Sequence, residues 1–478
     1  GSQDGRMPTD GSVWYIGDAA FAGKEEITAI TVPEEVRGIG LNAFMNCGAL
    51  QTVTLPSSLT YICANAFEYC YAIETVIFGG TEDQWYDLSI GDWNDYLLNA
   101  TIYVDGGDTL LKEASGEEPG IEAPAEGMDE YGFCYERVGD EYTLVSYVGT
   151  ETQLIIPDSF SGLPIQSIAM GAFQDNTALE GILIPASVRF IVAEAFQGCT
   201  SLSVLQFAEG SELVTIGSDA FQNCDSLVSV ILPEGLLEIG SRAFNSCDRL
   251  EEIYLPTTLE SIGTAAFAYS PKLGSVVLHE GLTTLGEDAF AGCEGLVSVS
   301  LPEGLTEIGG GAFAGCVLLE SITIPASVTT LGDWMFQSCS SLVSLAVEDG
   351  NEHYAGVGNC IIAKESGALL YGCQNSQIPT DGSVTSINWY AFFECTALES
   401  ITIPEGVTFI DLYAFEKCTN LRTVYLPSTL TGIAIEAFDE CENLETVYYN
   451  GSQDEFETKV SIGEYNGDLT YATFVFAK

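Results

Sequence analysis

The sequence predicts an α/β repeat solenoid, in which short parallel strands stack layer on layer and form a sheet along one face. Three observations predict this fold. A unit of about 23 residues recurs along the chain, and fixed periods of this length are typical of solenoids. Most of the 15 cysteines fall in one phrase of that unit, Ala-Phe-x-x-Cys. Each unit also contains a short alternating segment, Val-x-Leu, that ends at proline or a turn.

The parts of the repeat follow from their residues. Val-x-Leu is β-branched and alternates in polarity, which favours a strand. Proline has no N–H to donate, so it ends the ladder, and Pro-Glu-Gly then predicts a turn. Leu-x-x-Ile-Gly predicts a second short strand, and Ala-Phe-x-x-Cys predicts one helical turn with Phe and Cys inside. The units open at Ile16, Ile39, Ile62, Ile168, Ile191, Ile216, Ile239, Ile262, Leu285, Ile308, Leu331, Ile387, Ile410 and Ile433.

Two similar passages outside the repeat predict two solenoids, each with its own C-terminal cap. Trp85 in the first passage corresponds to Phe456 in the second, and Asn94 corresponds to Asn466. The last apolar layer of a solenoid needs a cover, so caps are expected at its ends. The predicted parts are a short solenoid over 1–106, an acidic linker over 107–130 and a larger solenoid over 131–478.

Hairpins are predicted at two places in the larger solenoid. Residues 133–135 and 142–145, joined by Gly139 and Asp140, predict a hairpin that covers its N-terminal end. An insertion at 348–386 lengthens one repeat, and it contains two further strand candidates, 360–363 and 368–371. The linker is rich in Gly, Glu and Pro, and its like charges favour an extended chain.

The charge excludes some classes of partner. The chain has 14 basic and 69 acidic residues, a formal net charge of −55, so it would repel nucleic-acid phosphates and anionic membranes. A solvated exterior explains this acidity, and loosely bound Ca²⁺ is the alternative. No stretch approaches the roughly 20 apolar residues that cross a bilayer, so no membrane insertion is expected. The first residues do not resemble a signal peptide, so none exists or it has been removed.

The cysteines are interpreted as reduced, buried thiols that fill small apolar spaces. Stacked strands lie about 4.8 Å apart, a poor fit to disulfide geometry between neighbouring layers. A bridge between Cys360 and Cys373, which flank the insertion hairpin, is left open. No Cys-x-x-Cys occurs, so no metal site is predicted, and no cofactor is expected.

The repeats, the caps, the opening hairpin and the insertion closely resemble the BspA-like leucine-rich repeat family of bacterial and protist surface proteins. The resemblance covers nearly the whole chain. It implies a leucine-rich repeat fold, a right-handed superhelix with a parallel concave sheet, short helical turns and hairpin caps. It also implies a secreted or surface location, and a role as an adhesin for host or bacterial proteins. The family has no shared catalytic motif, so no catalytic residue is carried over.

The sequence contains no motif of a hydrolase, zincin, nucleotide-binding or EF-hand protein, so an enzyme is not expected. A hydrolase centred on His353 and Glu352 in the insertion would need to show turnover. The expected function is recognition on the concave sheet, where residues flanking the buried valine point outward. Like charges at the same outward position of successive layers would repel each other. This repulsion by itself explains why the outward residues beside the buried valine are mostly neutral.

Exposed tyrosine is favoured at recognition surfaces, because it offers a large contact area at low entropic cost. Ordinary strand propensity explains the same tyrosines without a ligand. The leading hypothesis is protein–protein adhesion, and the alternative is a carbohydrate-binding module on the same face. The candidate ligand-binding residues are Tyr254, Tyr425, Tyr448, Glu252, Thr423 and Thr446.

Overall fold

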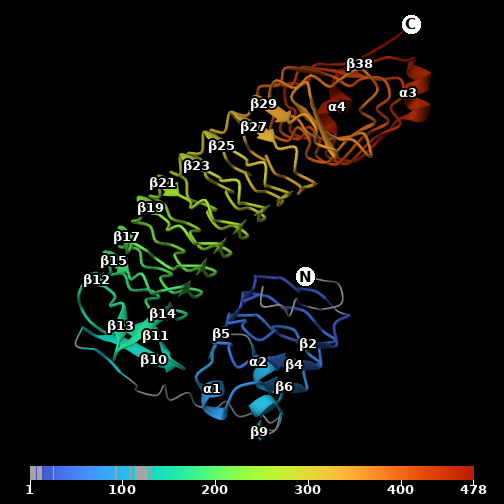
Figure 1. Ribbon diagram of the computed structural model, residues 1–478. Helices are drawn as coiled ribbons and strands as arrows, with labels where there is room; N and C mark the ends of the chain where they lie inside the picture. The colour runs from blue at the N-terminus through green and yellow to red at the C-terminus, as the bar shows by residue number, and fades with distance from the viewer. Residues whose placement is uncertain are drawn as a thin grey trace. The chain divides into compact units, whose positions relative to one another are not determined.

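The computed structural model describes residues 7, 13–24, 26–91, 94–107, 109–112, 127–129 and 131–477. The chain divides into two compact units, and both are built of stacked repeats of short parallel strands with few helices (Figure 1). Unit 1 comprises Gly1–Leu227 and Pro233–Asn245, and unit 2 comprises Val228–Leu232 and Ser246–Lys478. The division into solenoids at 107–130 stays a prediction, and residues 108, 113–126 and 130 of that segment lie outside the described residues.

Parallel pairing in strict register stacks the repeats of unit 1. Ile16 pairs with Ile39, and Ile39 pairs with Ile62, so equivalent side chains of successive repeats lie one above another. The first repeats form sheets β1-β3-β5-β7 (Tyr15–Ile16, Gly38–Ile39, Tyr61–Ile62, Ser89–Ile90) and β2-β4-β6-β8-β9 (Ala29–Thr31, Thr52–Leu55, Thr75–Phe78, Thr101–Val104, Thr109–Lys112), with a 3₁₀ turn η1 at Asp105–Gly107.

The predicted N-terminal hairpin is confirmed. Strands β10 and β11 pair antiparallel, and β11 then pairs parallel with β14, so the hairpin covers the first repeat that follows it. In unit 1 these strands and their successors are β10 (Phe133–Val138), β11 (Glu141–Tyr147), β12 (Gln153–Ile155), β13 (Ser159–Phe160), β14 (Leu163–Ile168), β15 (Gly181–Ile184), β16 (Phe190–Ile191), β17 (Val204–Phe207), β18 (Thr215–Ile216) and β20 (Glu238–Ile239).

Unit 2 begins with a six-stranded parallel sheet in which the predicted alternation is observed. Val230 is buried between exposed Ser229 and Ile231, and the following strands repeat this pattern. The sheet contains β19 (Ser229–Ile231), β21 (Glu252–Tyr254), β23 (Ser275–Val277), β25 (Ser298–Ser300), β27 (Ser321–Ile324) and β29 (Ser344–Val347). Beside it run β22 (Ser261–Ile262), β24 (Thr284–Leu285), β26 (Glu307–Ile308) and β28 (Thr330–Leu331).

The insertion contains the predicted hairpin and a third strand that was not predicted. Strand β30 (Tyr354–Val357) pairs antiparallel with β31 (Cys360–Ala363), which pairs antiparallel with β32 (Ala368–Tyr371). The buried side chain of Asn351 donates to the carbonyls of Pro325 and Val328, both at 2.9 Å. After the insertion, β33 (Ser386–Ile387), β35 (Phe409–Ile410), β37 (Gly432–Ile433) and β39 (Ser461–Ile462) continue one sheet, and β34 (Ser400–Thr402), β36 (Thr423–Leu426), β38 (Thr446–Tyr449) and β40 (Thr473–Phe476) form another.

The predicted inward-facing Phe and Cys of Ala-Phe-x-x-Cys are observed, but the prediction that these segments are helical was wrong. Alternate N–H groups of these segments donate to the next repeat: Phe290 N bonds Ala312 O at 2.9 Å, and Gly292 N bonds Ala314 O at 2.6 Å. Asp288 and Gly292, four residues apart, both have positive φ, which directs N–H groups between layers. These turns therefore form a third hydrogen-bonded face beside the two strand faces.

The helices of the described residues lie in the two cap segments. They are α1 (Glu82–Tyr86), α2 (Asp95–Leu98), α3 (Gln453–Lys459) and α4 (Gly467–Tyr471). The paired asparagines make equivalent contacts: Asn94 Oδ1 accepts from Phe67 N and Asn466 Oδ1 accepts from Phe438 N, both at 2.9 Å. Each asparagine thus forms hydrogen bonds with main-chain groups that would otherwise bond to a further repeat.

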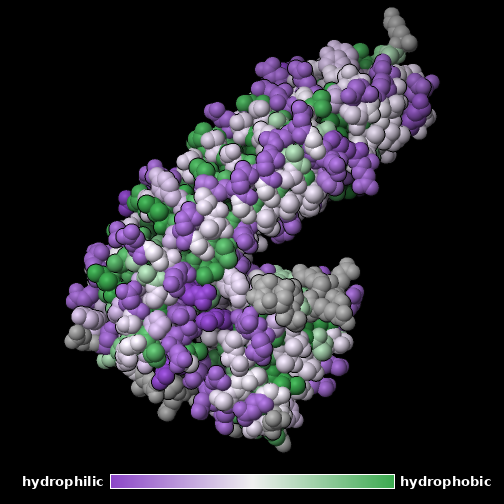
Figure 2. Space-filling model, in the orientation of Figure 1, coloured by the Kyte–Doolittle hydropathy of each residue, from purple (hydrophilic) through white to green (hydrophobic). Residues whose placement is uncertain are grey.

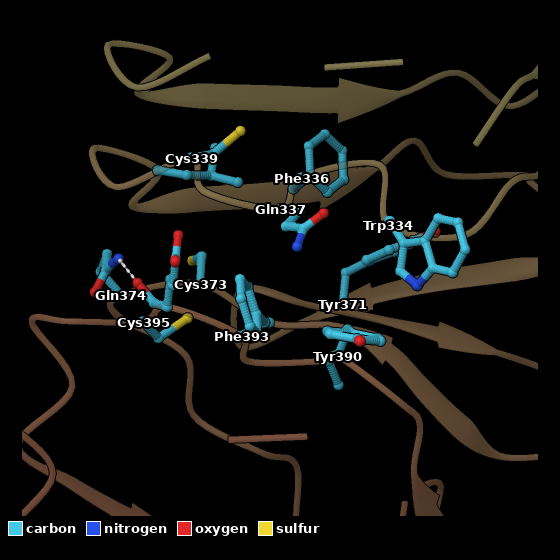
Figure 3. A pocket seen from close by; sticks show the side chains of 14 residues that line it. Trp334, Phe336, Gln337, Cys339, Tyr371, Cys373, Gln374, Tyr390, Phe393 and Cys395 are labelled. Carbon is cyan, nitrogen blue, oxygen red and sulfur yellow. Dashed lines mark hydrogen bonds between the residues drawn. The ribbon is translucent and has the colours of Figure 1, made fainter. Parts of the chain in front are cut away.

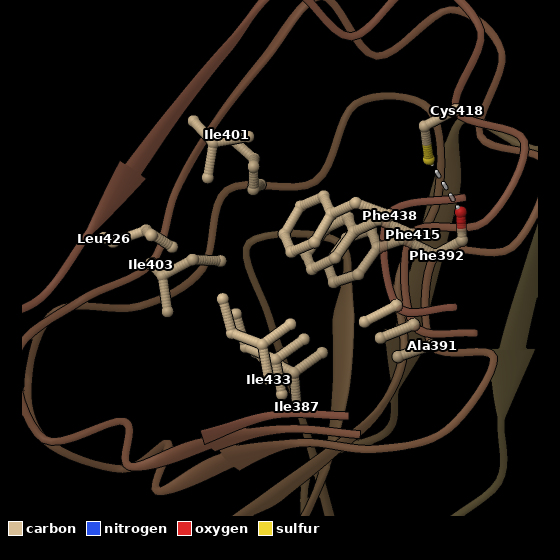
Figure 4. Close-up of a cluster of buried hydrophobic side chains, with 14 of the residues drawn as sticks. Ile387, Ala391, Phe392, Ile401, Ile403, Phe415, Cys418, Leu426, Ile433 and Phe438 are labelled. Atoms are coloured by element: carbon tan, nitrogen blue, oxygen red, sulfur yellow. Dashed lines mark hydrogen bonds between the residues drawn. The ribbon is translucent and has the colours of Figure 1, made fainter. Parts of the chain in front are cut away.

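A column of stacked phenylalanines forms the centre of each unit. In unit 2, Phe392, Phe415 and Phe438 lie parallel, with ring centroids 4.8 and 4.9 Å apart (Figure 4). Beside them the thiol of Cys418 donates to Phe392 O at 3.1 Å. All the cysteines are free, Cys360 and Cys373 included, and all except Cys134 are buried. The predicted reduced, buried thiols are therefore observed, with a hydrogen bond that the prediction did not include.

Candidate functional site

The structure brings four of the six predicted site residues together on the last sheet of unit 2. Strands β36 and β38 pair in register, so that Thr423 lies opposite Thr446 and Tyr425 lies opposite Tyr448. The two tyrosine rings stack with centroids 4.8 Å apart and planes 10° apart. Their exposed fractions are 42% and 38%, so the outward orientation predicted for them is observed.

Tyr254 and Glu252 lie on a different sheet from the tyrosine pair. Both are on β21, which belongs to the six-stranded sheet that ends at β29, before the insertion. The hydroxyl of Tyr254 donates to Glu252 Oε2 at 2.9 Å, and this bond to a carboxylate raises the pKa of Tyr254. The continuous column of outward residues expected along the larger solenoid is therefore divided in unit 2 between two sheets.

The stacked tyrosines border an open groove of about 590 Å³ with a mainly apolar lining. Side chains line it from the four strands of this sheet and the turns that follow them, and Val475 on β40 lies opposite Tyr448. The lining residues include Ile403, Pro404, Leu426, Pro427, Tyr449 and Phe476. The groove thus combines an apolar lining with two tyrosine hydroxyl groups.

A fixed carboxylate lies at the edge of this groove. Glu405 accepts hydrogen bonds from Ser428 N at 2.9 Å, Ser428 Oγ at 3.0 Å and Asn450 Nδ2 at 2.7 Å. Partial burial raises the pKa of Glu405, but these bonds outweigh it and leave the pKa below its ordinary value. The groove therefore carries a negative charge at neutral pH.

Sequence reasoning missed Glu405, Asn450 and Phe476. The Pro-Glu-Gly segment at 404–406 indicates a turn but does not say where the carboxylate points. Glu405 and Asn450 are far apart in the sequence, and only the stacking of repeats brings them together, as their hydrogen bond shows. Glu405 and Asn450 follow strands that are two repeats apart. An alignment of the turns after these strands would have placed the two residues near each other.

The described residues hold no group of three or more His, Cys, Asp or Glu side chains that could bind a metal ion. In the insertion, His353 and Glu352 are both exposed. Across the described segments, no helix is both long and apolar enough to cross a bilayer. Hydrophilic and neutral residues predominate on the face that Figure 2 shows.

Comparison with solved structures finds similar bacterial repeat proteins. A leucine-rich cell surface protein from Faecalibacterium prausnitzii is 25% identical over 71% of this chain and 98% of its own, with a TM-score of 0.47. A leucine-rich repeat protein from Bacteroides ovatus is 23% identical over 74% and 100%, with a TM-score of 0.47. The T. pallidum leucine-rich repeat protein is 33% identical over 41% and 91%, with a TM-score of 0.38.

Each of these TM-scores lies below 0.5, so the family assignment is made from the repeat itself. Comparison with curated proteins gives no match. The model of the BspA type leucine-rich repeat region matches this chain in 6 copies, over residues 8–86, 166–294, 261–356 and 366–464. These residues make up well over half of the chain and include most of the stacked repeats. The chain therefore belongs to the BspA-type leucine-rich repeat family.

Proposed function

We propose that this chain is a non-enzymatic recognition protein, secreted or held at the cell surface, whose concave sheet binds a protein partner. The observation that carries the proposal is the exposed, stacked pair of Tyr425 and Tyr448 beside an apolar groove. Tyrosine pairs of this kind supply rigid contact area, and buried aromatic anchors dominate the energy of many interfaces. Adhesion to a host or bacterial surface protein is the role that fits this site.

The chemistry of the groove favours a protein over a glycan. Its accessible apolar side chains, exposed Val475 and half-buried Phe476 beside the two tyrosines, suit an apolar side chain of a partner. The fixed charge of Glu405 and the net charge of −55 favour a partner with basic residues near the contact.

Binding to purified matrix proteins and to a glycan array would test this proposal. The full chain, Tyr425→Ala and Tyr448→Ala are compared by surface plasmon resonance against immobilised host matrix proteins and bacterial surface proteins. Each substitution is expected to weaken binding about tenfold to a hundredfold, the range for loss of an aromatic anchor. Tyr269→Ala is the matched control, because Tyr269 is 63% exposed in unit 2 but lies on a turn.

The outcomes separate the two hypotheses for this face. Loss of protein binding in both groove variants, with binding kept in Tyr269→Ala, supports the protein-binding proposal. Glycan binding that is lost in Tyr425→Ala, without protein binding, supports the carbohydrate alternative at the same residues. Full binding of every ligand by both groove variants would show that the groove is not the contact surface.

A further inference from the structure

Unit 2 carries a second group of aromatic side chains, exposed or half-buried, on the turns and not on the concave sheet. We call Trp334, Trp389, Tyr390, Phe393 and Tyr413 the turn-face platform. The rings are in continuous contact: Trp334 and Trp389 have centroids 5.3 Å apart, Tyr390 and Tyr413 stack at 4.8 Å, and Tyr390 meets Phe393 at 5.3 Å. Trp334 is 46% exposed and the other four residues are half-buried, so Trp334 presents the most open ring of the platform.

The insertion does not separate the platform. Trp334 precedes the insertion and Tyr390 follows it, yet their ring centroids are 6.2 Å apart. Tyr371 of the insertion packs edge-on against Phe336 at 5.3 Å and fills the space behind the platform. The cavity between these layers measures only about 20 Å³, room for about one water (Figure 3). A ligand would therefore lie on the rings, not enter the protein.

The backbone does not explain why these residues are aromatic. Trp334, Tyr390 and Tyr413 occupy the same position in three successive repeats, just before Ala-Phe or its variant, and each has positive φ. Glycine or asparagine adopts this conformation with less strain than a bulky residue. The equivalent positions in other repeats hold small, amide or charged residues, including Ala19, Asn42, Asn65, Gly171, Glu194, Asp219, Arg242, Ala265, Asp288, Gly311 and Glu436. Strained side chains that pack no core are typical of functional surfaces.

The charged groups around the platform are already paired within the protein. The indole Nε1 of Trp389 donates to Asp333 at 3.2 Å. Lys417 lies 3.8 Å from Glu394 and 3.9 Å from Glu416, and its Nζ sits 5.0 Å from the centroid of Phe393. The cation–π position on that ring is thus filled, which lowers the attraction for a cationic ligand. The net charge of −55 disfavours an anionic ligand.

We propose that the turn-face platform binds a neutral polysaccharide by stacking sugar rings on Trp334, Tyr390 and their neighbours. The C–H face of a pyranose is apolar and packs on aromatic rings, while its hydroxyl groups need polar partners at the edge. Asp333 and Glu394 provide carboxylate oxygens there. This site shares no residue with the groove of Tyr425 and Tyr448, so it stands independently of the proposed protein binding.

Affinity electrophoresis in gels that contain hydroxyethyl cellulose, xylan, galactomannan or soluble starch would test the proposal with the full chain. At least one neutral polysaccharide is expected to retard the protein. Trp334→Ala and Tyr390→Ala are each expected to weaken that retardation about tenfold, as expected for one lost stacking contact. Trp334→Phe keeps an aromatic face and should keep most of the binding, which separates loss of stacking from loss of fold.

The matched controls are Tyr269→Ala, an exposed aromatic at another turn with positive φ, and Tyr425→Ala in the groove. Both should bind the polysaccharide as the unchanged chain does. The proposal is overturned if none of the four polysaccharides retards the chain, or if Trp334→Ala is retarded fully. It is also overturned if choline chloride or an oligolysine peptide, and no polysaccharide, changes the tryptophan fluorescence.

Discussion

The thiol of Cys418 donates a hydrogen bond to the main-chain oxygen of Phe392 in the preceding repeat, with Sγ and O 3.1 Å apart. The same bond joins other layers, for example Cys70 to Phe44 at 3.1 Å and Cys316 to Phe290 at 3.3 Å. Each of these cysteines thus fills a small apolar space and gives a second hydrogen bond to a turn carbonyl that already accepts a main-chain N–H, as Phe392 O does from Cys395 N at 3.1 Å. Cysteine is small enough for the site and still carries a donor.

Removal of this bond should destabilise unit 2. Cys418→Ala removes one of the two donors to Phe392 O, which also accepts from Cys395 N at 3.1 Å, and opens a small space, so we expect a loss of about 1–3 kcal/mol in the free energy of unfolding. Cys418→Ser keeps a donor and should cost less. Serine already stands at the equivalent position 270, where its Oγ accepts from Cys247 N at 3.3 Å. Denaturant unfolding followed by circular dichroism measures both, and equal stability of all three chains would contradict the prediction.

The thiols should be unreactive in the folded protein. Burial is the largest cause that raises the pKa of Cys199 to about 12 and that of Cys293 to about 12, and thiolates are the reactive form. We expect 5,5′-dithiobis-(2-nitrobenzoic acid) at pH 8 to label no buried thiol, while half-buried Cys134 alone is open to reaction. All 15 thiols should react in guanidinium chloride. Rapid labelling of several thiols without denaturant would contradict the buried column.

Asn466 should matter more for stability than an exposed asparagine of the same unit. Asn466→Ala leaves Phe438 N and Ala434 O without their side-chain partner, and we expect a loss of about 2–4 kcal/mol. Asn443 is the matched control, because its amide donates to Thr419 O at 2.7 Å but is exposed. Asn443→Ala should cost less than about 1 kcal/mol. Hydrogen exchange at Phe438 N–H reports the opening directly, and unchanged protection there would contradict the role of Asn466.

The charge of Glu405 should stabilise the groove above acidic pH. Hydrogen bonds from Ser428 and Asn450 keep the pKa of this carboxyl below its ordinary value despite partial burial, so the folded state holds the ionised form more strongly than the unfolded state. The stabilisation is therefore present above the ordinary pKa and is lost as pH falls through the lowered one. Glu405→Gln should reduce stability by less than about 1 kcal/mol at pH 7, because the group is largely exposed. Thermal melts at pH 7 and pH 3 measure this, and a difference that persists at pH 3 would contradict it.

The repeat explains why much of the fold was predictable. Val230 and its equivalents lie in strands because short β-branched segments alternate between exposed and buried positions, and the repeat places such a segment in every layer. The hairpins at 133–145 and 360–371 were found because a turn separates two apolar runs. Asn94 and Asn466 were paired from sequence, and their equal contacts follow from equal positions in the caps.

The features that were missed depend on contacts between layers. Ala-Phe-x-x-Cys resembles a helical turn locally, but N–H groups such as Phe290 N bond the neighbouring repeat, and no local pattern reports that choice. The meeting of Trp334 with Tyr390 depends on how the insertion folds back, so neither residue stood out in the sequence. The Tyr425–Tyr448 pair was predicted because register alone brings it together, whereas Glu405 needed a turn conformation.

The amide of Asn466 bonds main-chain atoms: the N–H of Phe438 and the oxygen of Ala434 in the last repeat, and the oxygens of Gly463 and Glu464 in the cap. A cap that bonds main-chain groups in this way would cover the last repeat whichever repeat came before it. Unequal recombination within the gene could therefore add or delete whole repeats without any change to the contacts of the cap. The number of stacked repeats can thus change in steps while the cap and the neighbouring Tyr425–Tyr448 pair stay intact.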